Sequence, residues 1–528
     1  EYALYIFNIT LGNPFYIKQI ILSIQAESSF PDGKKADDLL IAEHFVKINI
    51  NENVIDYLVR KFNRLPKNMQ LLLKIAACFG NQINSNHLAL TMSLEQEVIL
   101  NKLWFAVEAG MLLPLKEVAS TEDHHVKHFY FIHDRVQQAI YSLISSDEKT
   151  DIHAMIGKNL KKQLAENEQN EALFNVCEHL NLGQAKLSGN ELLQLAVLNK
   201  RAGELAKQKG AFEYAFRFFL QAKKLLPRLS WEEHYHLSVQ VWTGVGETAY
   251  LNSEFSLAEE AFNKVIENGK NIADRLKVYN LKITLYTHLH RISEAVESGL
   301  KGLQLFGWSL KKSPGKTAIV RELLLILLTL RNRKPEDLAN LKKMDNEQHR
   351  LIMQTLINLN APAYHENQNL ATVLMLRAFR YTLKFGVTDL TALVFNNYAL
   401  IQSAGFQNFE KCYQYGKLAV DLVELLNKNS LKGRVYFVYG SFINHWREHL
   451  RQNTTYLRQS QAACLAAGNI HLAGATSSFI IMTKMMEGNN LQEVLQEINE
   501  QFKFVTTINF QLSLNYLAEM KHWVEVLM

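Results

Sequence analysis

Hydrophobic residues recur every three or four positions through most of the chain after residue 147. This spacing places the apolar side chains on one face of a helix, and it continues for almost 400 residues. Only 8 prolines and 24 glycines occur in the 528 residues, so few positions interrupt such helices. The pattern predicts an all-α architecture for residues 148–528.

Two segments of this helical region share a pattern of small and aromatic residues. The segments "NKRAGELAKQKGAFEYAFRFFLQAKKLLP" and "WTGVGETAYLNSEFSLAEEAFNKV" match the tetratricopeptide (TPR) unit. The matching positions are Gly203, Ala215, Phe219, Ala222 and Pro227 in the first segment, and Trp242, Gly246, Ala258 and Phe262 in the second. The two glycines lie 43 residues apart, as do the alanines at 215 and 258.

The repeated pattern predicts a right-handed TPR-like α-solenoid over residues 148–528. A glycine inside a helix costs about 1 kcal/mol against alanine, so its recurrence indicates a close approach of two helices. We expect Gly203 to face Ala215 across its helix pair. Later segments keep the small residues less regularly, and an irregular helical bundle is the alternative.

A different pattern occupies residues 51–147. Three or four short helices precede two strand-favouring segments, Met111–Val118 and Val126–Ile132, with a polar tip at Ser120–His125 between them. A β-hairpin after a helical trio is typical of a small winged-helix domain, and the hairpin would be its wing. Residues 1–50 resemble the end of another helical unit followed by a polar linker.

Charge argues against nucleic acid as a partner. The formal net charge is only +5. The helix before the wing, which would enter the major groove, carries Glu95, Glu97 and Glu108 against a single Lys102. Phosphate contacts need the opposite sign, so we expect the domain to bind protein and no nucleic acid.

Hydropathy and cysteine usage suggest a cytoplasmic location. The longest apolar run, Leu323–Leu328, is far shorter than the ~20 residues of a membrane span, so no membrane span is expected. The four cysteines are far apart and form no C-x-x-C pair, which fits a reducing compartment.

Two stretches superficially suggest a ligand site. "SPGKTAIVRELL" resembles part of a phosphate-binding loop, but Leu310 stands where that loop needs its first glycine. We therefore expect an inter-helix loop with Lys316 in solvent. Four histidines at 124, 125, 128 and 133 lack the cysteine or carboxylate partners typical of zinc sites, and a solvated wing is the simpler interpretation.

His133-Asp134, within "FYFIHDRVQQAIY", stands where a strand is predicted to meet a helix. Asp134 could cap free N–H groups of that helix, which leaves the histidine unexplained. No motif places a nucleophile near this pair. We expect no catalytic residue and no metal site in the chain, although an enzyme within the repeats is a remaining alternative.

Several blocks of the chain resemble one bacterial family. They include "GNPFYI", "LPKNMQLLLKIAACFGNQI", "FIHDRVQQAIY" and "LNKRAGELAKQKGAFEYAFRFFLQA", and the similarity extends from Gly12 to about Glu487. The family consists of large signalling proteins that join a serine/threonine kinase, a STAND-class AAA ATPase, helical repeats, a GAF domain and a sensor histidine kinase.

The resemblance implies roles for two motifs. Gly12-Asn13-Pro14 matches the G-x-P motif in the ATPase lid, whose proline lies against the adenine. His133-Asp134 matches a histidine-aspartate pair in which the histidine reaches the β-phosphate of ADP. The Walker A lysine and Walker B acids are not in this chain, so ATP or ADP with magnesium would bind an upstream nucleotide-binding domain of the parent.

The resemblance also implies an overall function. The chain would be a regulatory segment that couples nucleotide state, and a protein or peptide bound in the solenoid groove, to kinase output. The runner-up is a STAND transcription activator of the maltose-regulator type, whose DNA-binding domain would lie outside this chain.

Overall fold

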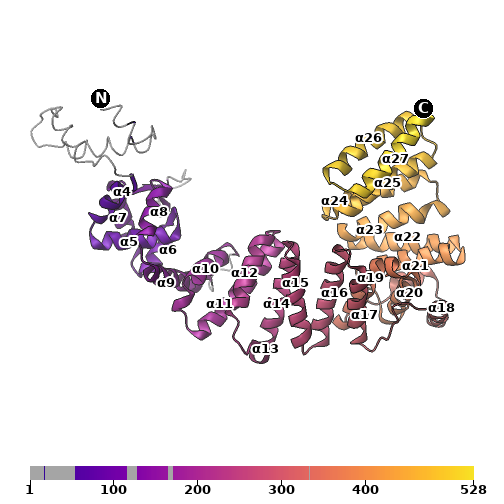
Figure 1. The fold of residues 1–528 in the computed structure, drawn as a ribbon, viewed down its shortest axis with the longest axis horizontal. Coiled ribbons are helices and arrows are strands. Elements are labelled where there is room, and N and C mark those ends of the chain that lie inside the picture. Colours follow the sequence, from indigo (N-terminus) through magenta and orange to yellow (C-terminus); the bar gives the residue numbers. More distant parts are fainter. Residues whose placement is uncertain (1–6, 8–16, 18–53, 116–127, 165–169, 332) are drawn as a thin grey trace, which may run out of the picture. The chain divides into compact units, whose positions relative to one another are not determined.

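The computed structural model describes residues 7, 17, 54–115, 128–164, 170–331 and 333–528 (Figure 1). They belong to two compact units, Glu1–Ser230 and Trp231–Met528. Gly12, Asn13 and Pro14, most of the predicted lid and the whole predicted wing tip lie outside the described residues.

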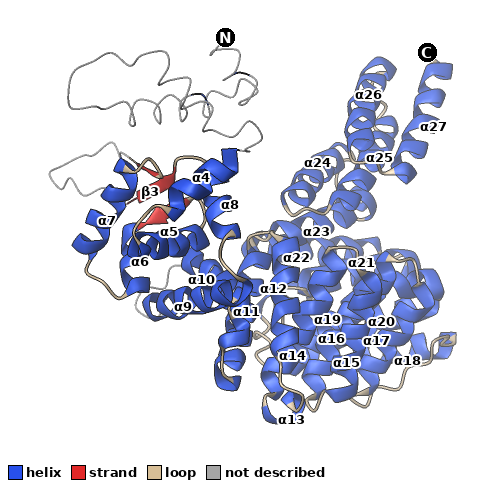
Figure 2. Cartoon of the chain, turned by 60° about the vertical axis from the view of Figure 1, so that its left-hand side comes forward, coloured by secondary structure: helices blue, strands red, loops and turns tan. Residues whose placement is uncertain are grey.

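The first unit begins with short helices and a small sheet. Its elements are α4 (Val54–Asn63), α5 (Lys67–Phe79), β1 (Gln82–Asn84), α6 (Ser85–Met92), α7 (Gln96–Glu108), β2 (Leu112–Pro114), β3 (His128–Phe131) and α8 (Asp134–Ser142). The strands form one antiparallel sheet in the order β1-β3-β2, and Figure 2 shows them among the helices. The two predicted strands are present, but β1 was not predicted.

Alternation of side chains explains how β3 covers the core. Phe129 and Phe131 point inward and are fully buried, while His128 and Tyr130 are half-buried on the other face. Because strand side chains alternate with a period of two, this short strand places both phenylalanines against the helices.

Four longer helices complete the first unit. They are α9 (Ser146–Leu164), α10 (Asn170–Leu182), α11 (Gly189–Gln208) and α12 (Phe212–Leu225), with a 3-10 turn, η1 (Gln184–Lys186), between α10 and α11. One hydrophobic cluster runs from Phe62 to Phe218. Lys74 on α5 pairs with Glu148 on α9 at 2.8 Å. The boundary predicted at residues 147/148 therefore lies within a continuous core.

The second unit is helical throughout apart from one isolated bridge between Lys343 and Val387, as far as its described residues show. Its helices begin with α13 (Ser230–Glu233), α14 (Tyr235–Leu251), α15 (Phe255–Asn268), α16 (Ile272–His288), α17 (Ile292–Gln304), α18 (Lys316–Leu330), η2 (Pro335–Asn340), α19 (Glu347–Glu366) and α20 (Gln368–Phe385). They continue with α21 (Thr391–Phe406), α22 (Phe409–Leu426), α23 (Asn429–Phe442), η3 (Asn444–Trp446), α24 (Arg451–Ala466), α25 (Ile470–Met486), α26 (Leu491–Thr507) and α27 (Gln511–Leu527).

Most consecutive helices pack in pairs, although α18 packs against α20, and the fold is an all-α TPR-like solenoid as predicted. The two segments with the repeated pattern form α11 with α12 and α14 with α15. Ala215, Ala222 and Ala258 are fully buried in these pairs. Pro227 is exposed two residues after α12, where its ring cannot interfere with a helix.

The glycines of the repeats have aromatic neighbours rather than small ones. A Cβ added at Gly203 would lie 2.8 Å from the ring of Phe219, and one at Gly246 would overlap the ring of Phe262. The nearest neighbour of Gly203 is therefore Phe219, which lies four residues after the predicted Ala215 on α12. The missing Cβ makes room for a buried phenylalanine, which fills the space between the helices.

Candidate functional site

His133 lies at the junction between β3 and α8. The Ile132 N–H donates to the Met111 carbonyl at 3.1 Å, which fixes the backbone just before the histidine. His133 then adopts an extended conformation, and its Nδ1 accepts a hydrogen bond from the Arg135 N–H at 3.1 Å. The histidine, rather than Asp134, is therefore the N-cap of α8.

This geometry corrects the capping role predicted for Asp134. Asp134 is the first residue of α8 and is exposed. Its carboxylate there favours the positive end of the helix dipole without capping it. Because Nδ1 of His133 accepts a hydrogen bond, the neutral ring carries its proton on Nε2.

Helix α7, the predicted recognition helix, presents acidic and apolar side chains to solvent. Glu95, just before the helix, and Glu97 and Glu108 within it are exposed. Trp104 is 43% exposed and Phe105 is 45% exposed. This surface lacks the cationic character that a DNA phosphate backbone requires.

The remaining sequence candidates have simple structural accounts. Gly315 is the N-cap of α18, and Lys316, its first residue, is exposed, as predicted. Within the described residues, no group of three or more histidine, cysteine or acidic side chains could hold a metal ion. His124 and His125 lie outside those residues.

A pair of histidines, His153 buried and His179 half-buried, joins α9 to α10 in the first unit. Nδ1 of His153 lies 2.9 Å from Nδ1 of His179, and Nε2 of His153 lies 3.2 Å from the hydroxyl of Tyr141. Burial, and to a smaller extent the neighbouring His153, lowers the pKa of His179 to about 4. Burial also lowers the pKa of His153. Both rings are therefore neutral near pH 7.

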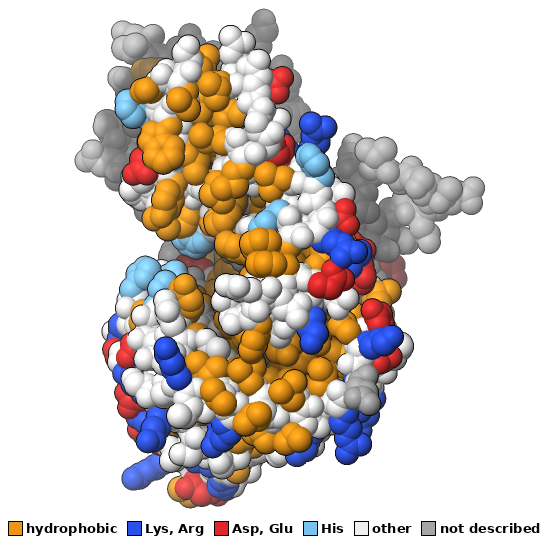
Figure 3. All heavy atoms as spheres, turned by 90° about the vertical axis from the view of Figure 1, so that its right-hand side faces the viewer, with side chains coloured by type: hydrophobic (Ala, Val, Ile, Leu, Met, Phe, Trp, Pro, Cys, Tyr) orange, Lys and Arg blue, Asp and Glu red, His pale blue; other side chains and the backbone are white. Residues whose placement is uncertain are grey.

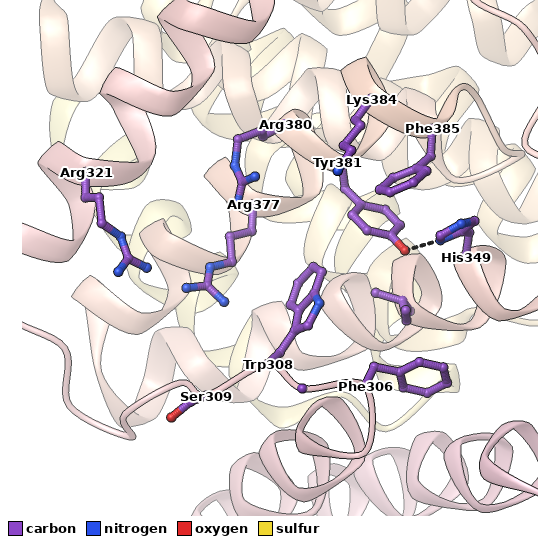
Figure 4. A pocket seen from close by; sticks show the side chains of 12 residues that line it. Phe306, Trp308, Ser309, Arg321, His349, Arg377, Arg380, Tyr381, Lys384 and Phe385 are labelled. Carbon is purple, nitrogen blue, oxygen red and sulfur yellow. Dashed lines mark hydrogen bonds between the residues drawn. The ribbon is translucent and has the colours of Figure 1, made fainter.

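The second unit contains a cationic pocket that the sequence analysis missed. It has a volume of about 510 Å³ and lies among α18, α19, α20 and the segment after α17 (Figure 4). Its cationic lining residues are Arg321, Arg377, Arg380 and Lys384. Figure 4 shows Arg321 and Arg377 pointing into the same space from α18 and α20.

One buried carboxylate organises these arginines. Glu322 on α18 is fully buried and accepts from Nε of Arg377 at 2.8 Å and from Nε of Arg380 at 3.0 Å. A buried carboxylate is tolerated only when charged donors satisfy it. Glu322 thus ties α18 to α20 and fixes the planes of both guanidinium groups.

Aromatic rings form the other wall of the pocket. The Trp308 and Tyr381 ring centroids lie 5.4 Å apart, and those of Tyr381 and Phe385 lie 4.5 Å apart. The guanidinium carbon of Arg377 lies 5.5 Å from the Trp308 ring. The hydroxyl of Tyr381 is hydrogen-bonded to Nδ1 of His349, and burial raises the pKa of this tyrosine to about 12.

The spacing of charged residues in "RAFRYTLKF" was one sequence signal that could have pointed to the cationic pocket. Arg377, Arg380, Tyr381 and Lys384 follow one another at spacings of three, one and three residues, which places them on one face of α20. A single glutamate in the apolar run of α18 was the second signal. Only the fold brings α18 and α20 together, so neither signal identified a pocket alone.

Comparisons with known proteins find a distant relative among the curated proteins. No family model matches it. The hybrid signal transduction histidine kinase G of Dictyostelium discoideum is 20% identical over 597 residues. That alignment covers 98% of this chain but only 17% of the kinase, so the chain spans a small part of this relative's length.

A solved structure also resembles the chain. It is the Signal Transduction ATPase with Numerous Domains (STAND) protein with a tetratricopeptide repeat sensor from Pyrococcus horikoshii. The identity is 13% and the TM-score is 0.37, with 97% of this chain and 71% of that chain covered. The fold assignment given above rests on the helix pairs themselves. None of the described helices is long and apolar enough to cross a membrane.

Proposed function

We propose that this chain is a regulatory segment of a larger signalling protein of the STAND type. The observation that carries the proposal is the alignment of 98% of the chain with a hybrid signal transduction histidine kinase. In this proposal the first unit responds to a nucleotide held by an upstream domain. The TPR-like helix pairs of the second unit receive a partner, and the combined state controls kinase output.

His133 is the proposed nucleotide sensor. Its Nδ1 is engaged with the N–H of Arg135 at the start of α8, so the ring is oriented and its Nε2 can act as a hydrogen-bond donor. A donor at the N-terminus of a helix suits an anion such as the β-phosphate of ADP. ATP or ADP with magnesium would be held by the upstream domain, with Gly12, Asn13 and Pro14 proposed beside the adenine.

Exposed apolar surfaces favour proteins as partners. On α7, Trp104 and Phe105 are exposed beside acidic residues, which suits a protein domain better than DNA. On α18, Leu327 and Leu328 are 64% and 72% exposed. Figure 3 views the second unit from the side on which α18 lies in Figure 1, and hydrophobic side chains gather there.

The alignment with a histidine kinase favours a kinase parent over the transcription activator. The region that follows this chain in the parent separates the two. A GAF domain and a histidine kinase there support the proposal, whereas a DNA-binding helix-turn-helix supports the activator.

The decisive experiment compares two substitutions of His133 in the complete parent protein. His133→Ala removes both the cap and the donor. His133→Asp keeps a good N-cap residue but places a negative charge where the phosphate would lie. A charge-assisted hydrogen bond contributes about 1.5–3 kcal/mol, so both variants should release ADP about 10- to 100-fold faster than the wild type.

The outcome separates sensing from capping. If His133→Ala accelerates ADP release while His133→Asp does not, the histidine acts only through helix stability. Equal release rates in all three proteins would remove His133 from the nucleotide site altogether.

A further inference from the structure

The pocket among α18, α19 and α20 has an excess of positive charge. Of its described lining residues, four are arginine or lysine and none is acidic. Glu322 behind the wall offsets one of these charges. We propose that the pocket binds a ring-bearing organic phosphate of mononucleotide size, and this inference rests on the proposed role of the helix pairs in receiving a partner.

The arginines form the phosphate end of the site. Arg377 and Arg380 each direct Nε toward Glu322 at 2.8 and 3.0 Å. No partner within the described residues is recorded for the terminal nitrogens of either guanidinium group, so these nitrogens can donate to a ligand. Arginine binds phosphate through such paired donors, and a guanidinium already fixed by a carboxylate loses little freedom on binding.

The aromatic wall forms the ring end of the site. Trp308, Tyr381 and Phe385 line the pocket, and Figure 4 shows Trp308 beside the guanidinium group of Arg377. Aromatic rings bind a planar group by stacking or edge contact. A volume of about 510 Å³ falls within the range of pockets that hold small organic ligands.

A purely structural ion network explains only part of this arrangement. Two arginines are sufficient to satisfy Glu322, and the Arg321 nitrogen is farther away at 3.5 Å. Lys384 lines the same pocket, and its ammonium lies 5.0 Å from the Phe385 ring without a recorded acidic partner in the described part of the chain. Like charges gathered around one open space destabilise one another, and an anion in that space relieves the repulsion.

Isothermal titration calorimetry on the 528-residue chain tests the proposal with AMP as the probe. Adenosine reports the ring system without the phosphate, inorganic phosphate reports the anion alone, and 4-hydroxybenzoate reports a smaller ring that bears a carboxylate. We expect AMP to bind in the micromolar to millimolar range, at least about tenfold more tightly than the other three. Added salt should weaken AMP binding because part of the site is open to solvent.

Variants of exposed cations test the location while keeping the two shorter contacts of Glu322, those with Arg377 and Arg380. Arg321→Gln combined with Lys384→Gln should weaken AMP binding about tenfold or more. Lys503→Gln changes an exposed lysine of α26 that does not line the pocket, and it should bind AMP as the wild type does. Arg380→Gln should weaken binding further, with circular dichroism confirming that the helices persist.

Any one of three results would overturn the proposal. The first is that AMP does not bind, and the second is that the double variant binds AMP as tightly as Lys503→Gln does. The third is that phosphate or 4-hydroxybenzoate binds as tightly as AMP does. The assay does not involve His133 or the parent's nucleotide, so its failure would leave the proposed nucleotide-sensing role of His133 unaffected. Conversely, AMP binding here together with unchanged ADP release in the His133 variants would reject only the sensing role of His133.

Discussion

Two helix–helix contacts in the second unit differ in chemistry: one is apolar, and the other contains a buried ion pair. Between α14 and α15, Gly246 makes room for the fully buried ring of Phe262, and the contact is apolar. Between α18 and α20, a buried carboxylate is held by Arg377 and Arg380 beside an open pocket. The first contact follows the repeat pattern and stabilises the solenoid. The second departs from the pattern, and such departures are where binding sites are expected.

The largest effect should come from Glu322→Gln. Removing one partner of a buried ion pair typically costs 3–5 kcal/mol, and Arg377 would keep a buried charge without its carboxylate. We expect a loss of about 3 kcal/mol, measured by hydrogen exchange in α18 and α20. Glu297→Gln, in an exposed pair with Lys301, is the matched control and should cost less than about 1 kcal/mol. Similar losses in both variants would contradict this account of the contact.

Gly246→Ala should have the next largest effect. The new methyl group would overlap the Phe262 ring, so we expect a loss of about 1–3 kcal/mol despite the better helix propensity of alanine. Gly315→Ala is the control, because the nearest atom to its new Cβ would be 3.8 Å away. The double variant Gly246→Ala with Phe262→Leu should recover part of the loss in urea unfolding. A more stable Gly246→Ala protein would show that the ring does not confine this glycine.

The pair of His153 and His179 offers a third kind of contact, polar but neutral. Burial lowers the pKa of His179 to about 4, well below the ordinary value of 6.5, so the unfolded chain gains a proton first as the pH falls. Stability from this site is therefore present above pH 6.5 and is lost as the pH falls toward 4. Hydrogen exchange in α9 and α10 across this range measures the loss. His179→Gln should flatten the dependence, and an unchanged profile would assign it to other groups.

The smallest effect should be the loss of helix stability caused by His133→Ala in the isolated 528-residue chain. Loss of an N-cap costs about 1 kcal/mol, and the exchange rates of α8 amides should rise accordingly. His133→Asp should leave these rates near the wild-type values, because aspartate is a favourable N-cap. Faster exchange in both variants would mean that the imidazole stabilises α8 through packing rather than capping.

The sequence by itself determined the helical repeats. Gly203 with Phe219 and Gly246 with Phe262 recur in phase, and helical periodicity is a local property that survives in the linear pattern. The same local patterns identified β2, β3 and the exposed Lys316. It did not identify β1, a three-residue strand that lies between two of the predicted short helices.

Tertiary structure decided the partners of these residues. It made the ring of Phe219 the nearest neighbour of Gly203, and it made His133 rather than Asp134 the cap of α8. It also brought Glu322 to Arg377 and Arg380, 55 and 58 residues away along the chain. Spacing within one helix shows which side chains share a face, but it does not show which other helix covers that face. That choice depends on how the whole set of apolar faces is buried together.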